Sequence, residues 1–157
     1  MKDDLEIKLS RRSILKGSSA LALVLAGSTI IARNVEADSK LTSEAIKKVV
    51  GSKTLSQGKV SISAPQIAEN GNTVPFSIEI DSPMTTADYV KSVHVFADGN
   101  PRPEVASFHF RPGSVAKVSS RMRMIKTQNI IAVAETSGGS VYSKKVKVKV
   151  TIGGCGG

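Results

Sequence analysis

Apolar and polar residues alternate in short stretches along most of the chain from residue 59 onward. In the clearest stretch, residues 141–152, valine or isoleucine alternates with lysine or threonine over the second half. Successive side chains of a strand point to opposite faces of a sheet, so this pattern predicts an antiparallel strand with one wet and one buried face. The residues expected on the buried face are Val146, Val148, Val150 and Ile152.

Turn signals separate these stretches, among them Asn70-Gly71, Asp98-Gly99 and Gly138-Gly139. We expect about seven strands, over residues 59–63, 73–80, 90–97, 105–111, 115–124, 129–135 and 141–152. That number and spacing are typical of a β-sandwich. Residues 38–152 are therefore predicted to form one all-β, antiparallel sandwich domain.

One stretch before the strands has a helical pattern instead. Apolar residues at helical spacing lie within residues 42–50, Thr42 or Ser43 can cap the start, and Gly51 can end it. The sequence therefore predicts a short N-terminal helix ahead of the sandwich.

The first residues have the organisation of an export signal. Arg11 and Arg12 are adjacent, an apolar run over residues 20–32 follows them, and Val35-Glu36-Ala37 offers a cleavage site. This order predicts a twin-arginine signal peptide over residues 1–37 and a periplasmic protein without stable membrane association after cleavage. The alternative is an N-terminal membrane anchor, although the apolar run is short for a span.

The chain is basic, with a formal net charge of +9. Nucleic-acid binding is not expected, because the Lys and Arg residues are scattered and aromatic residues make up only 4% of the chain. A basic surface suits small anions and acidic protein partners equally well.

The only cysteine, Cys155, lies in the terminal sequence Gly-Gly-Cys-Gly-Gly over residues 153–157. An unpaired cysteine in an exported protein indicates intermolecular pairing or a reactive thiol. Five extended residues reach at most about 16–18 Å, so we expect a flexible arm that packs against little. Its flexibility is expected to come from Gly153, Gly154, Gly156 and Gly157.

The sequence predicts no catalytic site and no metal site. His94 and His109 lie in expected strands and, with one distant cysteine, do not make a structural zinc set. No phosphate-binding glycine loop is present, because Gly138-Gly139 lies between strands and opens no helix. We expect a non-catalytic protein without a cofactor.

Most of the chain after the leader resembles SoxY, the sulfur-carrier subunit family of the Sox thiosulfate-oxidation system. The segments that carry the resemblance are residues 81–85, 93–101, 126–129, 132–135, 139–142, 148–152 and the terminal 153–157. The resemblance implies an immunoglobulin-like sandwich paired with a SoxZ-like β subunit in a heterodimer. It also implies that thiosulfate-derived sulfur is held covalently on Cys155.

The partners that the resemblance implies are enzymes that the arm visits in turn. They are a SoxAX-type haem cytochrome that conjugates thiosulfate to the arm, a SoxB-type hydrolase that releases sulfate and, in some systems, a SoxCD-type sulfane dehydrogenase. None of those activities is expected of this chain.

Two other readings of the lone thiol stay open. One is a structural or interaction β-sandwich that dimerises through a Cys155 disulfide, and the other is a thiol-based copper-binding module. The mass of the native protein separates them, because a sulfur adduct, a doubled mass and a bound metal differ.

Overall fold

The computed structural model describes residues 34–154 of the chain, and within them one helix precedes the strands. Helix α2 spans Asn34–Val50. The prediction of a cap at residue 42 or 43 was wrong, because Thr42 is buried inside the helix and Ser43 Oγ donates to Lys40 O at 2.8 Å. A serine or threonine that bonds the preceding turn has the same sequence signature as a cap.

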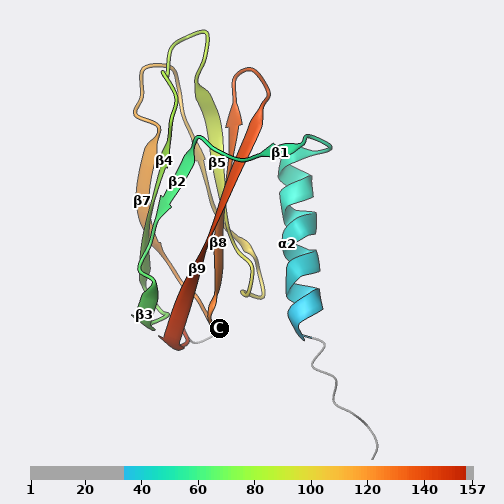
Figure 1. Ribbon diagram of the computed structural model, residues 1–157, viewed down its shortest axis with the longest axis vertical. Helices are drawn as coiled ribbons and strands as arrows, with labels where there is room; N and C mark the ends of the chain where they lie inside the picture. The colour runs from blue at the N-terminus through green and yellow to red at the C-terminus, as the bar shows by residue number, and fades with distance from the viewer. Residues whose placement is uncertain (1–33, 155–157) are drawn as a thin grey trace, which may run out of the picture. The chain divides into compact units, whose positions relative to one another are not determined.

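The described strands form two sheets (Figure 1). The larger sheet has the order β1 (Leu55–Ser56), β9 (Val141–Ile152), β8 (Gln128–Thr136), β5 (Val90–Ala97), β6 (Glu104–His109), and β3 (Ile67–Asn70) also pairs with β9. The smaller sheet has the order β2 (Val60–Ser63), β4 (Val74–Ile80), β7 (Lys117–Met122). The architecture is therefore the predicted all-β sandwich.

All seven predicted strands are present, each with its ends within two residues of the prediction. Strands β1 and β3 were not predicted, and both pair parallel with β9, so the sandwich is not purely antiparallel. Two to four residues are too few to show an alternating pattern. Their pairing partner also lies far away in the sequence, so no local signal announces them.

The main core lies between the two sheets. Val74 and Ile78 of the smaller sheet and Val93, Val95 and Ala132 of the larger one are each at most 1% exposed. Burying side chains of this size supplies the main driving force for folding, roughly 1.5–3 kcal/mol for each large one. The aromatic-poor composition is therefore compatible with a closed core.

Helix α2 covers part of the opposite face of the larger sheet (Figure 1). Ala45 and Val50 of the helix pack there against Phe96, Val133 and Val141. Parts of β5 and β8 are thus covered on both faces of the sheet. This explains why their residues are more uniformly apolar than those of β9.

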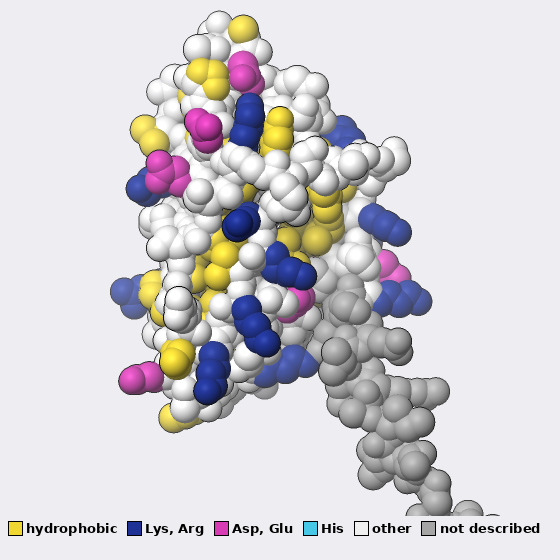
Figure 2. Space-filling model, viewed as in Figure 1, with side chains coloured by type: hydrophobic (Ala, Val, Ile, Leu, Met, Phe, Trp, Pro, Cys, Tyr) yellow, Lys and Arg dark blue, Asp and Glu magenta, His cyan; other side chains and the backbone are white. Residues whose placement is uncertain are grey.

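Strand β9 is buried only in part. Val148 is fully buried, Val146 and Val150 are half-buried, with Val150 packed against the main core, and Ile152 is 68% exposed. The predicted buried face is therefore fully buried only at Val148 and is wrong at Ile152. Ile152 is exposed because it is the last strand residue at the end of the sheet. Figure 2 shows Lys and Arg side chains spread over the face on which β9 lies.

A polar cluster lies on the outer face of the larger sheet, where β5 pairs with β6. His94 Nδ1 is 2.8 Å from Ser107 Oγ, His94 Nε2 is 3.1 Å from Ser92 Oγ, and the His109 ring stands edge-on at 6.1 Å between centroids. Burial lowers the pKa of His94, the charge of His109 lowers it further, and Glu135 acts in the opposite direction. His94 is therefore held preferentially in its neutral form.

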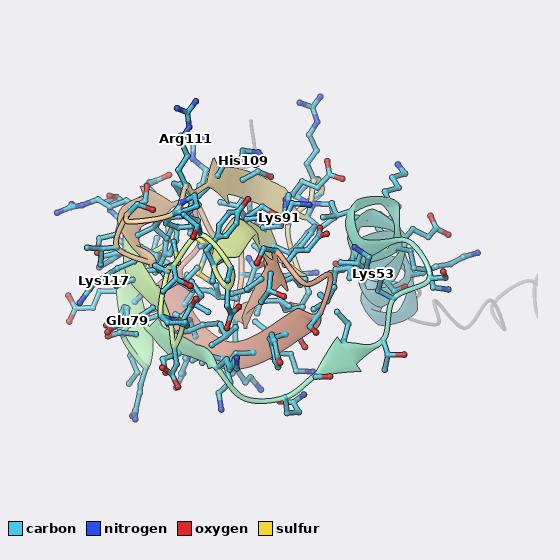
Figure 3. The ribbon with its side chains drawn as sticks, turned by 90° about the horizontal axis from the view of Figure 1, so that it is seen from above. Lys53, Glu79, Lys91, His109, Arg111 and Lys117 are labelled. Carbon is cyan, nitrogen blue, oxygen red and sulfur yellow. The ribbon has the colours of Figure 1, made fainter. Side chains whose placement is uncertain are left out.

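The same cluster contains an ion-pair group. The Glu135 carboxylate lies 2.7 Å from Lys53 Nζ and 3.6 Å from Lys91 Nζ. The hydrogen bond from Lys53 is the main cause that lowers the pKa of Glu135. Figure 3 shows Lys53, Lys91 and His109 well separated from the Lys117–Glu79 pair at another edge of the sandwich.

No helix within residues 34–154 is long and apolar enough to cross a membrane.

Candidate functional site at the root of the C-terminal arm

The predicted site residues are only partly within the described chain. Cys155, Gly156 and Gly157 lie outside the described residues, as do Arg11 and Arg12 of the predicted leader. Gly153 and Gly154 are described, so the structure defines the point at which the arm leaves the domain.

Three segments meet at that point and are joined by backbone hydrogen bonds. Gly71 N donates to Ile152 O at 2.8 Å, Met124 N donates to Gly71 O at 2.7 Å, and Gly154 N donates to Met124 O at 2.9 Å. The segments are the turn after β3, the link between β7 and β8, and the end of β9, which lie at the same end of the sandwich (Figure 1). We call these four residues, Gly71, Met124, Ile152 and Gly154, the arm clamp.

Glycine is required in the clamp for space. A Cβ on Gly71 would overlap Met124 O and lie 2.6 Å from Gly154 N, whereas real Cβ atoms keep more than 3.0 Å from such neighbours. A Cβ on Gly153 would overlap Ile125 O. None of these glycines has a positive φ, so close approach of the backbones, and not an unusual conformation, explains them.

For Gly154, the expectation that the arm packs against little was wrong. Gly154 is buried, bonds to Met124 and has the Arg123 side chain against it. Because glycine has no Cβ, backbone segments can touch here, and this contact fixes the chain. In the sequence alone, the same missing Cβ had suggested conformational flexibility. The part of the arm beyond the clamp therefore begins at Cys155.

Asn100 holds the link between β7 and β8 in place. Its Nδ2 donates to Arg123 O at 2.8 Å, and its Oδ1 accepts from Ile125 N at 3.2 Å and from Gln128 Nε2 at 2.8 Å. Gln128 is buried and its Oε1 accepts from Gly99 N at 2.7 Å. The carbonyl before Met124 and the backbone amide after it are thus both fixed by the side-chain amide of Asn100.

Further polar contacts anchor the neighbouring chain. Asp98 accepts from Asn129 N at 2.8 Å and from Asn129 Nδ2 at 2.6 Å, and Thr127 Oγ1 accepts from Val150 N at 2.9 Å. Asp98 was interpreted from the sequence through turn chemistry alone. It also ties the start of β8 to the end of β5, at the end of the sheet that carries the clamp.

Sequence reasoning missed Gly71, Asn100 and Gln128 as contributors to the site. A signal was present, because Asn100 and Gln128 lie in segments that carry the family resemblance and Gly71 lies in a predicted turn. What was absent from the sequence was the information that these segments meet at the last residues of β9.

One basic side chain, Arg123, borders the clamp, and a second, Lys126, lies beside Gly99. Arg123 Cγ lies 2.8 Å from the position of a Cβ on Gly154, and Lys126 Cε lies 2.8 Å from the corresponding position on Gly99. The stem of Arg123 therefore lies beside Gly154, the residue that precedes Cys155 in the sequence. Within the described residues no group of three or more His, Cys, Asp and Glu side chains could hold a metal ion.

Comparison with known proteins gives specific matches to one family and more general matches to other proteins. The family model described as "Sulfur oxidation protein SoxY" matches residues 46–155, a range that ends at Cys155. The solved structure of the sulfur carrier protein SoxY from Chlorobium limicola f thiosulfatophilum is 36% identical, with a TM-score of 0.62. The match covers 72% of this chain and 98% of that one. A search of curated proteins found no match.

More distant solved structures share only the fold. A superoxide reductase from Ignicoccus hospitalis is 15% identical with a TM-score of 0.54, covering 59% of this chain and 80% of that one. A putative superoxide reductase from Thermotoga maritima is 18% identical with a TM-score of 0.54, covering 61% and 93%. The family match over the sandwich and up to the cysteine, together with the 36% identical structure, shows that this chain belongs to the SoxY family of sulfur oxidation proteins.

Proposed function

We propose that this protein is a periplasmic sulfur carrier that holds thiosulfate-derived intermediates covalently on Cys155 and presents them to Sox enzymes. The observation that carries the proposal is the position of the only cysteine. It follows directly after a clamped strand end, at the last residue of the family match.

The chemistry needs only a thiolate from this chain. A haem cytochrome of the SoxAX type would remove two electrons as the Cys155 sulfur and the sulfane sulfur of thiosulfate form a bond, which gives a cysteine S-thiosulfonate. A SoxB-type hydrolase would then add water to the terminal sulfonate, release sulfate and leave a persulfide. A SoxCD-type dehydrogenase would oxidise that persulfide further where it is present.

The role of this chain in these steps is to hold and present the sulfur, and the enzymes supply the catalysis. The arm clamp supports that role, because the residues that carry the thiol start from one defined point on the domain. Residues beyond the clamp can then enter an active site. The predicted twin-arginine leader agrees with a periplasmic location. A SoxZ-like subunit is the proposed heterodimer partner.

The proposal is tested by the mass of the native protein, purified from cells grown on thiosulfate. We expect sulfur and sulfonate adducts that map to Cys155 and disappear on reduction. In a reconstituted system, Cys155→Ser should abolish thiosulfate-dependent turnover while the thermal unfolding midpoint is unchanged, because serine cannot form the S–S bond. A doubled mass without sulfur adducts would instead support the disulfide-linked interaction domain, and turnover by the serine variant would exclude the carrier role.

A further inference from the structure

Three lysines lie at alternate positions in the second half of β9, namely Lys145, Lys147 and Lys149, and all three are exposed. Val148, between two of them, is fully buried in the main core. Because successive side chains of a strand point to opposite faces, the three lysines share the outward face of the larger sheet. They span roughly 13–14 Å, with about 7 Å between neighbours. We call them the lysine row, and Figure 2 shows Lys and Arg side chains along the region where β9 runs.

The surroundings of the lysine row on that face are nearly neutral. Its register partners on the adjacent strands are uncharged, namely Ile131, Asn129 and Ile67. Two carboxylates lie at the margins. Asp98 is bound by the backbone and side-chain amides of Asn129 at 2.8 and 2.6 Å, and Glu69 follows Ile67 by two residues in β3. Neither forms an ion pair with the row in the part of the chain that the structure describes.

Other lysines of the domain do have carboxylate partners. Lys53 and Lys91 share the Glu135 carboxylate. Lys117 Nζ lies 3.1 Å from Glu79 Oε2. No lysine of the row has such a partner within residues 34–154. The Debye length at physiological ionic strength, about 8 Å, is close to the spacing within the row, so the fields of neighbouring lysines overlap in one strip of positive potential.

We propose that the lysine row is a docking surface for a protein partner that presents a carboxylate-rich face. The three lysines stand side by side along a strand and do not converge on one point. An extended acidic surface therefore matches them better than a single small anion does. Because the field of exposed lysines does not depend on one side-chain conformation, the row can steer such a partner before contact is made.

Two other polyanions match this surface less well. Nucleic-acid binding uses aromatic side chains on which bases stack, and the large exposed hydrophobic residues of the described chain are all aliphatic. A membrane surface takes up apolar side chains that lie next to the basic ones. Of the large exposed hydrophobic residues in the described chain, only Ile67 is in register with a lysine of the row.

The composition of the surface favours a partner that binds transiently. Permanent subunit interfaces are large and hydrophobic, whereas this face is mainly charged and polar. The row also leads toward the arm clamp, because Lys149 precedes Ile152 by three residues in the same strand. A partner held on the row is thereby placed beside the end of the sandwich from which the arm leaves. That this partner is an enzyme served by the carrier rests on the proposed function, whereas the preference of the row for carboxylates does not.

The preference for carboxylates is tested first without any enzyme. The isotope-labelled full-length protein is titrated with a short glutamate peptide at low salt, and the chemical shifts of its backbone amides are followed. We expect the largest shifts at residues 145–149 and at Ile67, and we expect them to disappear at high salt. A single-stranded oligonucleotide and phosphatidylglycerol vesicles are titrated in the same way.

The triple Lys→Gln variant of the lysine row should weaken peptide binding roughly tenfold, at about two- to threefold for each screened charge. The matched control Lys40→Gln/Lys48→Gln/Arg111→Gln removes the same charge from exposed positions on α2 and in the loop after β6. It should weaken binding less than about twofold, because these charges lie off the row. A second variant, Lys147→Glu, reverses the central charge at one exposed position and should weaken binding about fivefold.

The row could instead protect an open strand edge. Between its pairings with β1 and β3, β9 has no strand on that side in the described chain, and lysines at such an edge oppose aggregation. A row variant that aggregates while its soluble fraction binds the peptide as the wild type does would overturn the docking proposal. Equal weakening by the matched control would overturn it too, as would tighter binding of the row to the oligonucleotide or the vesicles than to the peptide.

The consequence for the carrier is measured with a haem cytochrome of the SoxAX type. The row variant should raise the KM for the carrier several-fold and leave kcat nearly unchanged, because docking and not chemistry is affected. An unchanged KM, or a lowered kcat alone, would overturn the docking role. If the carrier function itself is wrong, the native protein carries no sulfur adducts, whereas the peptide titration still decides whether the row binds carboxylates.

Discussion

The arm root, which is the arm clamp together with the Asn100 and Gln128 side chains beside it, and the polar cluster on the outer face of the larger sheet are held by different kinds of interaction. Backbone hydrogen bonds, neutral amide side chains and the close approach of glycines hold the root. The cluster depends on titratable groups, namely His94, His109, Glu135 and two lysines. The two regions lie toward opposite ends of β5 and β8. The comparison teaches that the arm clamp, which contains no titratable side chain, should not follow the titration of the polar cluster, whereas the stability of the domain should.

The largest effect is expected from Gly71→Ala, which tests whether steric fit holds the root. The added methyl group would overlap Met124 O, and the conflict involves backbone that cannot simply rotate away. We expect a loss of about 3 kcal/mol in the free energy of unfolding, at the upper end of overpacking effects. Urea unfolding followed by circular dichroism measures it.

Two other glycines are matched controls for that substitution. Gly139 has open space around it but a φ of +82°, so Gly139→Ala should cost only about 1 kcal/mol of backbone strain. Gly138 has neither a positive φ nor a neighbour closer than 4.0 Å, so Gly138→Ala should change little. A ranking in which Gly139→Ala cost more than Gly71→Ala would break the steric account of the clamp.

Asn100→Ala tests the amide network with an intermediate effect. It removes the donor to Arg123 O and leaves Ile125 N and Gln128 Nε2 without this acceptor, so we expect a loss of about 1–2 kcal/mol. Hydrogen exchange at the Met124 and Gly154 amides should accelerate more than exchange in β5. If exchange at these two amides stayed at the wild-type rate, Asn100 would be a turn residue only.

Gly154→Ala and Gly156→Ala compare the two sides of the cysteine. Gly154→Ala should lower stability by about 1 kcal/mol, because a Cβ there lies 2.8 Å from Gly71 O, while the Arg123 stem can move. Gly156→Ala adds the same methyl group beyond the clamp and should leave the thermal unfolding midpoint unchanged. Equal midpoints for the two variants would show that Gly154 is not held in solution.

The smallest effect is expected from pH, and it belongs to the polar cluster. The pKa of His94 is lowered in the folded state, so the unfolded chain binds its proton more tightly. Stability should be full above pH 6.5, the ordinary histidine value, and should be lost as the pH falls from there through the lower folded pKa. His94→Gln should flatten this step in the urea midpoint measured between pH 7.5 and 5.

The pKa of Glu135 is also lowered, so its contribution is present above the ordinary carboxyl pKa and is lost as the pH falls through the folded value. This second loss of stability should occur at lower pH than the loss that belongs to His94. Exchange at the Gly154 amide, corrected for intrinsic pH dependence, should not follow either step. An arm root that loosened together with the histidine step would show that the two regions are coupled.

The sequence was sufficient to predict the strands that alternate and the turns between them. Residues 90–97 and 141–152 were predicted with their exact ends, because strand-forming residues are bounded there by turn residues, and the second half of 141–152 also alternates strictly. Helix α2 was predicted too short, since Ser43 in a helix interior and at a cap cannot be distinguished locally. Strands β1 and β3 were missed because only tertiary pairing with β9 defines them.

The arm root shows where residue type alone is ambiguous. Gly153 and Gly154 suggested freedom, yet in the fold they allow three backbones to touch, and only coordinates distinguish the two uses of a missing Cβ. From the sequence, Asn100 could equally be a turn residue or part of a hydrogen-bond network. The identity of the thiol, in contrast, needed no fold, because the chain contains one cysteine.

The parallel pairing of β9 with both β1 and β3 has a consequence for synthesis. Leu55 is in register with Val141 and Ala68 with Val150. Strands β1 and β3 therefore cannot form their backbone pairing until β9 is present. Contacts of such long sequence separation slow folding. A nascent chain cannot complete this fold until β9 has been synthesised. If the leader directs only folded protein across the membrane, a chain truncated before β9 would not be exported. Export would then select for domains that also contain Cys155.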